Sequence, residues 1–347
     1  MPSGLYHTTY RSSIKRFQTF FVKFWFTLFV MGLIALPLLG FNYILSILIN
    51  AGIAVIVVLG LNVLTGMTGL ISIGHAAFVG IGAYASVILT TRLGMPYYLV
   101  FFCAGAIAAL SGLIVGIPSL RLKGLYLAIT TMAFQFIAQH VFLRWTSLTA
   151  GTAGLEVPPI RFGHWAFNTD VKMYYFVMLV VALAITGVSN LTRSRVGRAF
   201  VAIRDSYIAA EVMGVSLFRY KLLAFSLSAF YAGVAGSLLA HYSGFISPEG
   251  FYMELSIQYI AMIIVGGMGT VLGSIYGATF MTIIPEVLRY ITSKLGEDYP
   301  YFVSIFVYSK GLIFGLLILL FLIYEPDGFY GRWRKIKTYF RIWPYSY

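Results

Sequence analysis

Long apolar stretches separated by short polar loops follow one another along the chain from about residue 17 to residue 324. A helix needs roughly 20 apolar residues to cross the hydrocarbon core of a bilayer. The pattern therefore predicts membrane-spanning segments near residues 17–40, 43–64, 70–91, 97–118, 124–143, 173–192, 221–243, 255–267, 270–289 and 302–324. The eighth segment is short for a complete crossing, which predicts a broken or half helix whose ends are covered by protein.

Composition supports the same class of protein. Hydrophobic residues make up 60% of the chain and charged residues 10%, whereas a soluble domain has about 45–50% and about 25%. We therefore expect an all-α integral membrane protein with about ten transmembrane helices, some of them broken or re-entrant. With the single cysteine Cys103, an intrachain disulfide and a cysteine-based metal cluster are both excluded.

The chain carries 24 Lys and Arg against 11 Asp and Glu, a net charge of +13. In a soluble protein this excess would suggest nucleic acid as a partner. Here the basic residues gather in short loops, as the positive-inside rule requires, so membrane orientation is the better explanation and no nucleic acid is expected. Both termini are then expected in the cytoplasm. The predicted parts are a cytoplasmic segment (1–16), a polytopic membrane domain (17–324) and a basic cytoplasmic tail (325–347).

Two loops are longer than the others. Residues 144–172 form the longest loop predicted outside, and residues 193–220 the longest predicted inside between spans. The inside loop is predicted to be helical, because good helix formers dominate its middle and no proline interrupts it. Such a basic helix can lie on anionic lipid headgroups or dock a partner protein, and its sequence allows both.

The stretch "GLNVLTGMTGLISIGHAAFVGIGAY", residues 60–84, is apolar but rich in glycine and polar residues. It predicts the end of one span, a break at Gly66–Gly69 and the start of the next. Polar side chains in such a stretch satisfy freed backbone groups or face a pathway, and the candidates are Asn62, Thr65, Ser72 and His75. The break fits a position near the cytoplasm and a re-entrant position near the midplane equally well.

A second stretch, "GGMGTVLGSIYGATF", resembles "GMTGLISIGHAAFVG" in opening with a Gly-rich turn and continuing into a helix of small residues. Internal repeats with glycine-interrupted segments point to a translocation pathway, so Gly266, Gly267 and Gly269 join the pathway candidates. Gly269, Gly273 and Gly277 are spaced four apart, which favours close helix packing. We assign Gly273 and Gly277 to that packing.

Residues with catalytic or ion-binding chemistry are scarce in the predicted spans. His75 is the one ionisable residue well inside a span, and a lone histidine is more often a packing residue than a ligand. No metal-ligand spacing, catalytic triad or phosphate-binding loop is present. We therefore expect no enzyme activity, no catalytic residue, no metal and no cofactor. A self-contained secondary transporter is the rival class, and the shortage of buried carboxylates argues against it.

Several motifs carry a family resemblance. They are "RSRVGRAFVAIRDSYIAAEVMGVSLFRYKLLAFSLSAFYAGVAGSLLAHYSGFISPEGF" (193–251), the stretch 60–84, "LRLKGLYLAI" (120–129), "GGMGTVLGSIYGA" (266–278) and "IYEPDGF" (323–329). In this order they resemble the LivM-type permease subunits of ATP-binding-cassette (ABC) importers for branched-chain amino acids. The resemblance covers roughly residues 43–330.

In that family the inside loop couples the permease to an ATPase through a short helix, here near residues 198–218. Ala209, Ala210 and Gly214 keep the family's Ala-Ala-x-x-x-Gly spacing, but Ile208 stands where a glutamate is usual. Small residues allow close approach to a partner, and Gly214 lets the chain turn away. The resemblance implies that the coupling residues are Arg204, Asp205, Ala209, Ala210, Glu211 and Gly214, with Glu211 or Asp205 in place of the missing glutamate.

The resemblance also implies a function. The chain is expected to be the permease of a binding-protein-dependent importer that moves Leu, Ile and Val across a bacterial inner membrane. Its partners would be a homologous LivH-like permease, two cytoplasmic ATPase subunits that bind the ATP, an extracytoplasmic substrate-binding protein and the lipid bilayer. Related permeases carry urea, short amides and other amino acids, so these substrates stay open.

Overall fold

The computed structural model describes residues 20–119, 124–162, 165–167, 169–296, 311, 315–316, 319–321, 323–325 and 327–342. The α-helices are α2 (Phe20–Ala35), α3 (Asn42–Leu61), α4 (His75–Thr91), α5 (Tyr97–Ser119), α6 (Leu125–Arg144), α7 (Thr146–Thr149), α8 (Asp170–Arg193), α9 (Arg195–Asp205), α10 (Tyr207–Val212), α11 (Leu217–Ser243), α12 (Met253–Gly266), α13 (Val271–Gly296) and α15 (Gly328–Ile342). Short elements join them: η1 (Leu36–Leu39), the π-helical η2 (Asn62–Met67), η3 (Gly151–Ala153), η4 (Pro248–Phe251), β1 (Leu155–Glu156), β2 (Arg161–Phe162), β3 (Trp165–Ala166) and β4 (Phe245–Ile246).

Six helices in the described residues are long and apolar enough to cross a membrane: Asn42–Met67, Tyr97–Pro118, Leu125–Arg144, Asp170–Arg193, Leu217–Ser243 and Val271–Tyr290. Two shorter apolar helices, Lys23–Leu38 and His75–Thr91, accompany them. The prediction of a helical multi-pass membrane protein is confirmed. The predicted span 302–324 lies largely outside the described residues, as do residues 1–19 and the basic pair Arg121 and Lys123.

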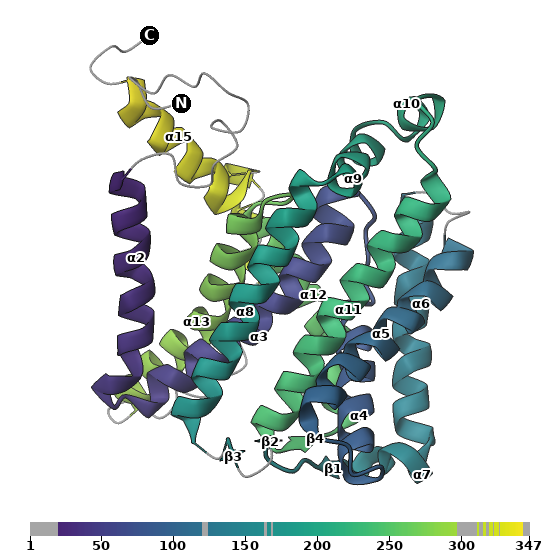
Figure 1. The fold of residues 1–347 in the computed structure, drawn as a ribbon, viewed down its shortest axis with the longest axis vertical. Helices are drawn as coiled ribbons and strands as arrows, with labels where there is room; N and C mark the ends of the chain where they lie inside the picture. The colour runs from purple at the N-terminus through teal and green to yellow at the C-terminus, as the bar shows by residue number, and fades with distance from the viewer. Residues whose placement is uncertain are drawn as a thin grey trace.

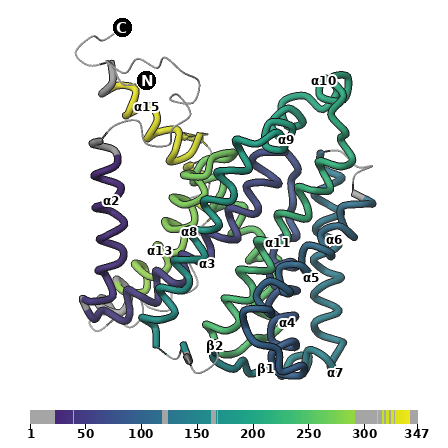
Figure 2. The backbone as a smooth tube through the Cα atoms, viewed as in Figure 1, coloured from purple at the N-terminus to yellow at the C-terminus, as the bar shows by residue number. Residues whose placement is uncertain are grey.

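Helix α11 lies at the centre of the bundle, between α3 on one side and α4 and α5 on the other (Figures 1 and 2). Small residues allow this close packing. A Cβ atom on Gly236 of α11 would overlap the Val79 carbonyl of α4, and one on Gly112 of α5 would lie 2.7 Å from the Ala229 Cβ. Because lipid is as apolar as the helix surfaces, such close contacts replace the hydrophobic drive that holds soluble bundles together.

The two long loops lie at opposite ends of the bundle. The loop 144–172 folds over one end, where β1 pairs antiparallel with β4, so that the segments following α6 and α11 are joined. The loop 193–220 lies at the other end and carries α9 and α10, while α15 is found at this end too (Figure 1). Which side of the membrane each loop faces stays a prediction.

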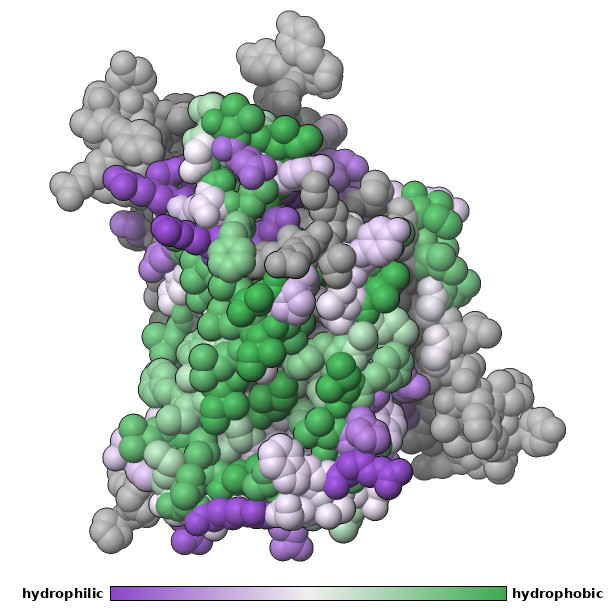
Figure 3. Space-filling model, turned by 90° about the vertical axis from the view of Figure 1, so that its right-hand side faces the viewer, coloured by the Kyte–Doolittle hydropathy of each residue, from purple (hydrophilic) through white to green (hydrophobic). Residues whose placement is uncertain are grey.

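The molecular surface shows the banding of a membrane protein. Figure 3 shows hydrophobic residues covering the middle of one face, with hydrophilic residues gathered toward its two ends. Large exposed hydrophobic side chains on α5, α6 and α8 include Phe102, Leu110, Ile114, Ile129, Phe136, Ile137, Leu179 and Leu183. These positions are suited to contact with lipid.

The helix expected near residues 198–218 is two helices instead of one. The backbone is extended at Ser206, with φ −160° and ψ 105°, and the Ser206 hydroxyl accepts a hydrogen bond from the Ala209 amide at 3.3 Å. Serine is a preferred N-cap residue because its side chain replaces a missing helical partner. The cap therefore starts a new helix, α10, where residue propensities alone predicted continuation.

We expect Gly236→Leu to lower the stability of the protein, because its side chain would have to displace the α4 backbone. Overpacking of this kind costs about 3 kcal/mol or more. The melting temperature of the purified protein in detergent measures the effect. Gly32→Leu on α2 is the matched control, since nothing lies within 4 Å of a Cβ built there. Equal melting temperatures for the two variants would contradict the α4–α11 packing described.

Candidate functional site

The membrane helix α3 ends in the π-helical turn η2, after which the chain reverses direction. Gly69 has φ +74°, a left-handed conformation that L side chains rarely adopt. The Leu70 amide donates to the Leu64 carbonyl at 3.1 Å. The Thr65 hydroxyl donates to the Leu70 carbonyl at 3.1 Å. Hydrogen bonds within the turn thus satisfy several of its own backbone amides and carbonyls.

A second turn of the same kind separates α12 from α13. Gly267 has φ +112° and Gly269 has φ +79°, and α13 begins at Val271. A Cβ on Gly277 of α13 would overlap the Met262 carbonyl of α12. The two helices therefore meet backbone to backbone, which brings the end of α12 and the start of α13 close together.

The two glycine-rich turns are in direct contact, and we call residues 62–70 together with 266–270 the turn junction. The side-chain amide of Asn62 donates to the Thr270 carbonyl at 3.0 Å and accepts from the Gly269 amide at 2.8 Å. Asn62 is fully buried. A Cβ on Gly66 would overlap both the Gly269 amide and the Asn62 side chain, so glycine is required there.

Arg204, near the end of α9, joins the loop 193–220 to the turn junction. Its Nη1 donates to the Gly66 carbonyl at 3.1 Å. A Cβ on Gly269 would lie 2.9 Å from the same nitrogen. The guanidinium also pairs with the Asp205 carboxylate at 3.0 Å, but both side chains are well exposed and such pairs contribute little. The contact with Gly66 is thus the specific one.

Beyond Arg204, the short helix α10 projects from the end of the molecule (Figure 1). Gly214, with φ +83°, ends it, and the amides of Gly214 and Val215 donate back to the last turn of α10. Ala210 is buried against the protein, whereas Val212 and Met213 are 82% and 83% exposed. The tip of this segment is therefore an apolar surface without a described covering.

Helix α4 begins at His75, after an irregular stretch, and its first amides are bonded by side chains from other helices. Thr131 of α6 accepts from the Ile73 amide at 3.0 Å, and Gln135 accepts from the Ala77 amide at 2.7 Å. Thr131 and Gln135 are six and ten residues into α6 (Leu125–Arg144), about 9–15 Å along its axis. The start of α4 therefore lies part-way through the bundle.

Gln135 also connects α4 to α12. Its Nε2 donates to the Phe251 carbonyl at 2.7 Å, and its Oε1 accepts from the Ser256 hydroxyl at 3.3 Å. Ser256 in turn accepts from the Ala76 amide at 2.8 Å. We call Thr131, Gln135 and Ser256 the α4 cap. Their amide and hydroxyl groups neutralise the open end of a helix that starts inside the protein.

Two of the predicted pathway residues lie beside the α4 cap and not in the turn junction. Ser72 and His75 are fully buried, and within the described residues the Ser72 hydroxyl has no hydrogen-bond partner. The His75 ring packs edge-on against Phe78, with ring centroids 5.9 Å apart. No cluster of three metal-ligating side chains is found among the described residues.

Comparison with known proteins decides the family. The family described as "Branched-chain amino acid transport system / permease component" matches residues 43–322. The chain belongs to this permease family.

Its relatives are transport permeases. The LivM permease protein of the high-affinity branched-chain amino acid transport system of Salmonella typhimurium is 33% identical over 80% of this chain and 67% of its own length. The Escherichia coli LivM protein gives the same values. The LivH permease protein of Salmonella typhimurium is 26% identical over 80% of this chain and 91% of its own length. No solved structure matches the chain.

The permease brings most of the site residues expected from sequence into two groups. Asn62, Thr65, Gly66, Gly69, Gly266, Gly267 and Gly269 belong to the turn junction, with Gly273 and Gly277 in the adjoining α12–α13 contact and Arg204 bound to it. Ala209, Ala210, Glu211 and Gly214 belong to α10 and its end. Sequence reasoning missed Thr131, Gln135, Ser256 and Thr270. Of the α4 cap, Gln135 is an isolated polar residue in an apolar segment, which is the signal that could have found it.

We expect Asn62→Ala to destabilise the permease, because it removes the partner of the Gly269 amide and one of the partners of the Thr270 carbonyl. The cost is about 2 kcal/mol, and thermal unfolding in detergent measures it. Asn50→Ala is the matched control on the same helix. Asn50 is exposed, and within the part of the chain that the structure describes its amide donates to the Ser46 carbonyl of its own helix alone. An Asn62 variant as stable as the Asn50 variant would contradict the role of Asn62 in joining the turns.

Proposed function

We propose that the chain is the LivM-like permease subunit of a binding-protein-dependent ABC importer that translocates branched-chain amino acids. It works with a LivH-like permease, two cytoplasmic ATPase subunits and an extracytoplasmic binding protein. The observation that carries the proposal is the hydrogen bond from Arg204 to Gly66, since it connects the loop expected to meet the ATPases with the turns expected to line the pathway.

The end of the bundle with α9 and α10 faces the cytoplasm. Arg193, Arg195, Arg198 and Arg204 lie in or next to α9, and cytoplasmic loops are enriched in such residues. The opposite end, with the loop 144–172, then faces the binding protein. Both chain termini are placed in the cytoplasm by the same reasoning, and the membrane is a bacterial inner membrane.

Helix α10 is the coupling helix that sits in a groove of an ATPase. Its exposed apolar residues Ile208, Val212 and Met213 supply the contact area, and the small Ala209 lets the partner approach closely. Glu211 is exposed beside them and can meet a basic group of the partner. An apolar tip of this kind is poorly suited to solvent and well suited to a protein groove.

Movement at α10 reaches the membrane through α9. Phe200 and Ile203 bury one side of α9, and the Phe200 ring packs edge-on against Tyr220 of α11, 6.3 Å away. When ATP binding draws the ATPases together, α9 moves with α10, and Arg204 transmits the displacement to the turn junction. The junction joins α3 to α13, so both helices respond, and the permease pair alternates its opening.

Leu, Ile and Val are the proposed substrates, on the strength of what the LivM and LivH relatives transport. Urea, short amides and other amino acids are alternatives within the same mechanism. A self-contained secondary transporter is a weaker alternative, because it usually needs buried carboxylates or an ion cage. Among the described residues, Glu325 is the only fully buried carboxylate, and it pairs with Arg332 and Lys335 of α15.

We expect Arg204→Ala to uncouple transport from ATP hydrolysis while the subunits stay assembled. Loss of one coupling contact predicts a fall in uptake of about tenfold. Leucine uptake into proteoliposomes holding the complete importer measures it, with co-purification of the ATPases as the assembly check. Arg198→Ala is the matched control, because among the described residues the Arg198 guanidinium bonds to the Arg193 carbonyl of its own segment and not to the turn junction. Uptake equal to that of the control would reject the coupling role of Arg204.

We expect Val212→Asp to reduce the amount of ATPase that co-purifies with the permease, because it places a charge in the apolar contact. The exposed Leu93, in a loop at the opposite end, provides the control Leu93→Asp. Affinity purification of each variant, followed by quantification of the ATPase subunits, compares the two variants. If both variants retained the ATPases equally, α10 would not be the docking helix.

A further inference from the structure

A polar stripe runs along the exposed face of α3 near its start. Tyr43, Ser46 and Asn50 are spaced three and four residues apart, which places them on one side of the helix. Tyr43 is 52% exposed, and Asn50 is exposed as well. From Tyr43 to Asn50 the stripe extends about 10 Å along the helix. It therefore reaches well into a segment that is long and apolar enough to cross the membrane.

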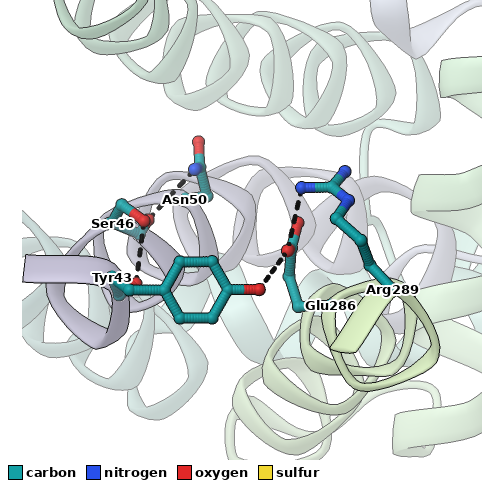
Figure 4. Close-up of polar contacts among 5 residues, drawn as sticks. All are labelled: Tyr43, Ser46, Asn50, Glu286 and Arg289. Carbon is teal, nitrogen blue, oxygen red and sulfur yellow. Dashed lines mark hydrogen bonds and ion pairs between the residues drawn. The ribbon is translucent and has the colours of Figure 1, made fainter. Parts of the chain in front are cut away.

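Helix α13 adds a charged pair to this stripe (Figure 4). The Tyr43 hydroxyl donates to the Glu286 carboxylate at 2.8 Å, and Arg289 Nη1 lies 3.0 Å from the same oxygen. Along α3, the Ser46 hydroxyl donates to the Tyr43 carbonyl at 2.8 Å and the Asn50 amide donates to the Ser46 carbonyl at 3.0 Å. We call Tyr43, Ser46, Asn50, Glu286 and Arg289 the outer polar stripe.

The outer polar stripe is not suited to contact with lipid. Polar and charged groups exposed to hydrocarbon are costly, and in membrane proteins they face water-filled cavities or other protein. The Arg289 side chain is 67% exposed and the Glu286 side chain 22%. The Asn50 amide oxygen points away from Ser46 in Figure 4 and accepts no hydrogen bond from a described residue. The stripe thus offers both donors and acceptors to something outside the described chain.

Aliphatic side chains border the charged pair. Ile283 and Val287 are exposed on α13, one turn apart and next to Glu286, and Ile44 is exposed beside Tyr43 on α3. A carboxylate, a guanidinium and neutral hydrogen-bonding groups next to aliphatic surface match one class of small molecule. That class is a zwitterionic amino acid with an aliphatic side chain, whose ammonium meets Glu286 and whose carboxylate meets Arg289.

We propose that the outer polar stripe lines the extracytoplasmic part of the translocation pathway and transiently binds the head group of the passing amino acid. The inference rests on the proposed function and extends it by naming the residues that meet the substrate. Glu286 pairs with Arg289 and Tyr43 in this structure, so the substrate exchanges these contacts for its own. That exchange keeps binding weak, which suits a pathway supplied by a separate binding protein.

Thiol labelling of the complete importer tests whether the stripe faces water. Replacing Cys103, the one cysteine, by alanine gives a background into which Asn50→Cys or the control Ile114→Cys is introduced. Ile114 is 70% exposed on α5 in the apolar belt. A membrane-impermeant, charged thiol reagent added from the extracytoplasmic side is expected to modify Asn50→Cys and to block leucine uptake, and to leave Ile114→Cys unmodified.

Two labelling results would overturn the proposal. One is an Asn50→Cys variant as unreactive as Ile114→Cys. The other is an Asn50→Cys variant that reacts only in the permease purified without its partner permease, which would assign the stripe to a subunit interface. Slower labelling in the presence of binding protein saturated with leucine would support the proposal, because the passing substrate then shields the position.

Charge substitution tests the recognition itself. Glu286→Gln is expected to lower leucine uptake about tenfold, the effect of losing a hydrogen bond to a charged group, while the ATPases still assemble. Glu254→Gln, an exposed carboxylate at the start of α12, is the matched control. Uptake by Glu286→Gln equal to that of the control would overturn the inference and leave the proposed function intact. Absence of leucine, isoleucine and valine uptake by the unmodified importer would reject the proposed function itself.

Discussion

The structure depends on one constraint, which is that backbone amides and carbonyls inside a membrane protein must find partners within the protein. Helices that break in the membrane expose such groups. The Asn62 side chain meets this need at the turn junction by bonding to Gly269 and Thr270. Gln135 meets it at the start of α4 and in the segment before α12. Two buried side-chain amides thus permit the interrupted helices around which the rest of the bundle packs.

The same constraint gives the molecule its mechanical connections. A side chain that bonds to the backbone of a distant segment also holds the two segments together. The point where a helix is interrupted is therefore also a point where two segments are connected. Arg204 repeats this arrangement from outside the bundle, because its guanidinium bonds to the Gly66 carbonyl within the break. On the proposed function, a displacement of α9 therefore acts on the place where α3 and α13 meet. The glycines around it allow the three segments to approach so closely.

Hydropathy alone predicted the positions of most helices to within a few residues, because each span must be long and apolar whatever surrounds it. The glycine-rich turns were also found from sequence, since Gly69 and Gly269 adopt conformations that other residues avoid. Local sequence patterns did not predict hydrogen bonds between residues that are distant in sequence. Gln135 and the Ala77 amide are 58 residues apart, and nothing near either one indicates the other. The break at Ser206 was missed for a different reason, since a serine within good helix formers predicts a cap only weakly.

On the proposed function and the inference above, substrate contacts and energy coupling lie at opposite ends of the helix bundle. The turn junction is closely packed around Asn62, which joins its two turns and is fully buried, and such packing suits a joint that transmits movement. In the outer polar stripe the exposed Tyr43 and Arg289 contact the half-buried Glu286, and in the inference above a polar solute replaces these contacts. A tight binding site in the pathway would slow the release of the solute. Weak binding at the extracytoplasmic end is therefore compatible with a rigid junction at the other end. If both proposals hold, substitutions near Glu286 of α13 would change the solutes that the permease accepts without altering the turn junction.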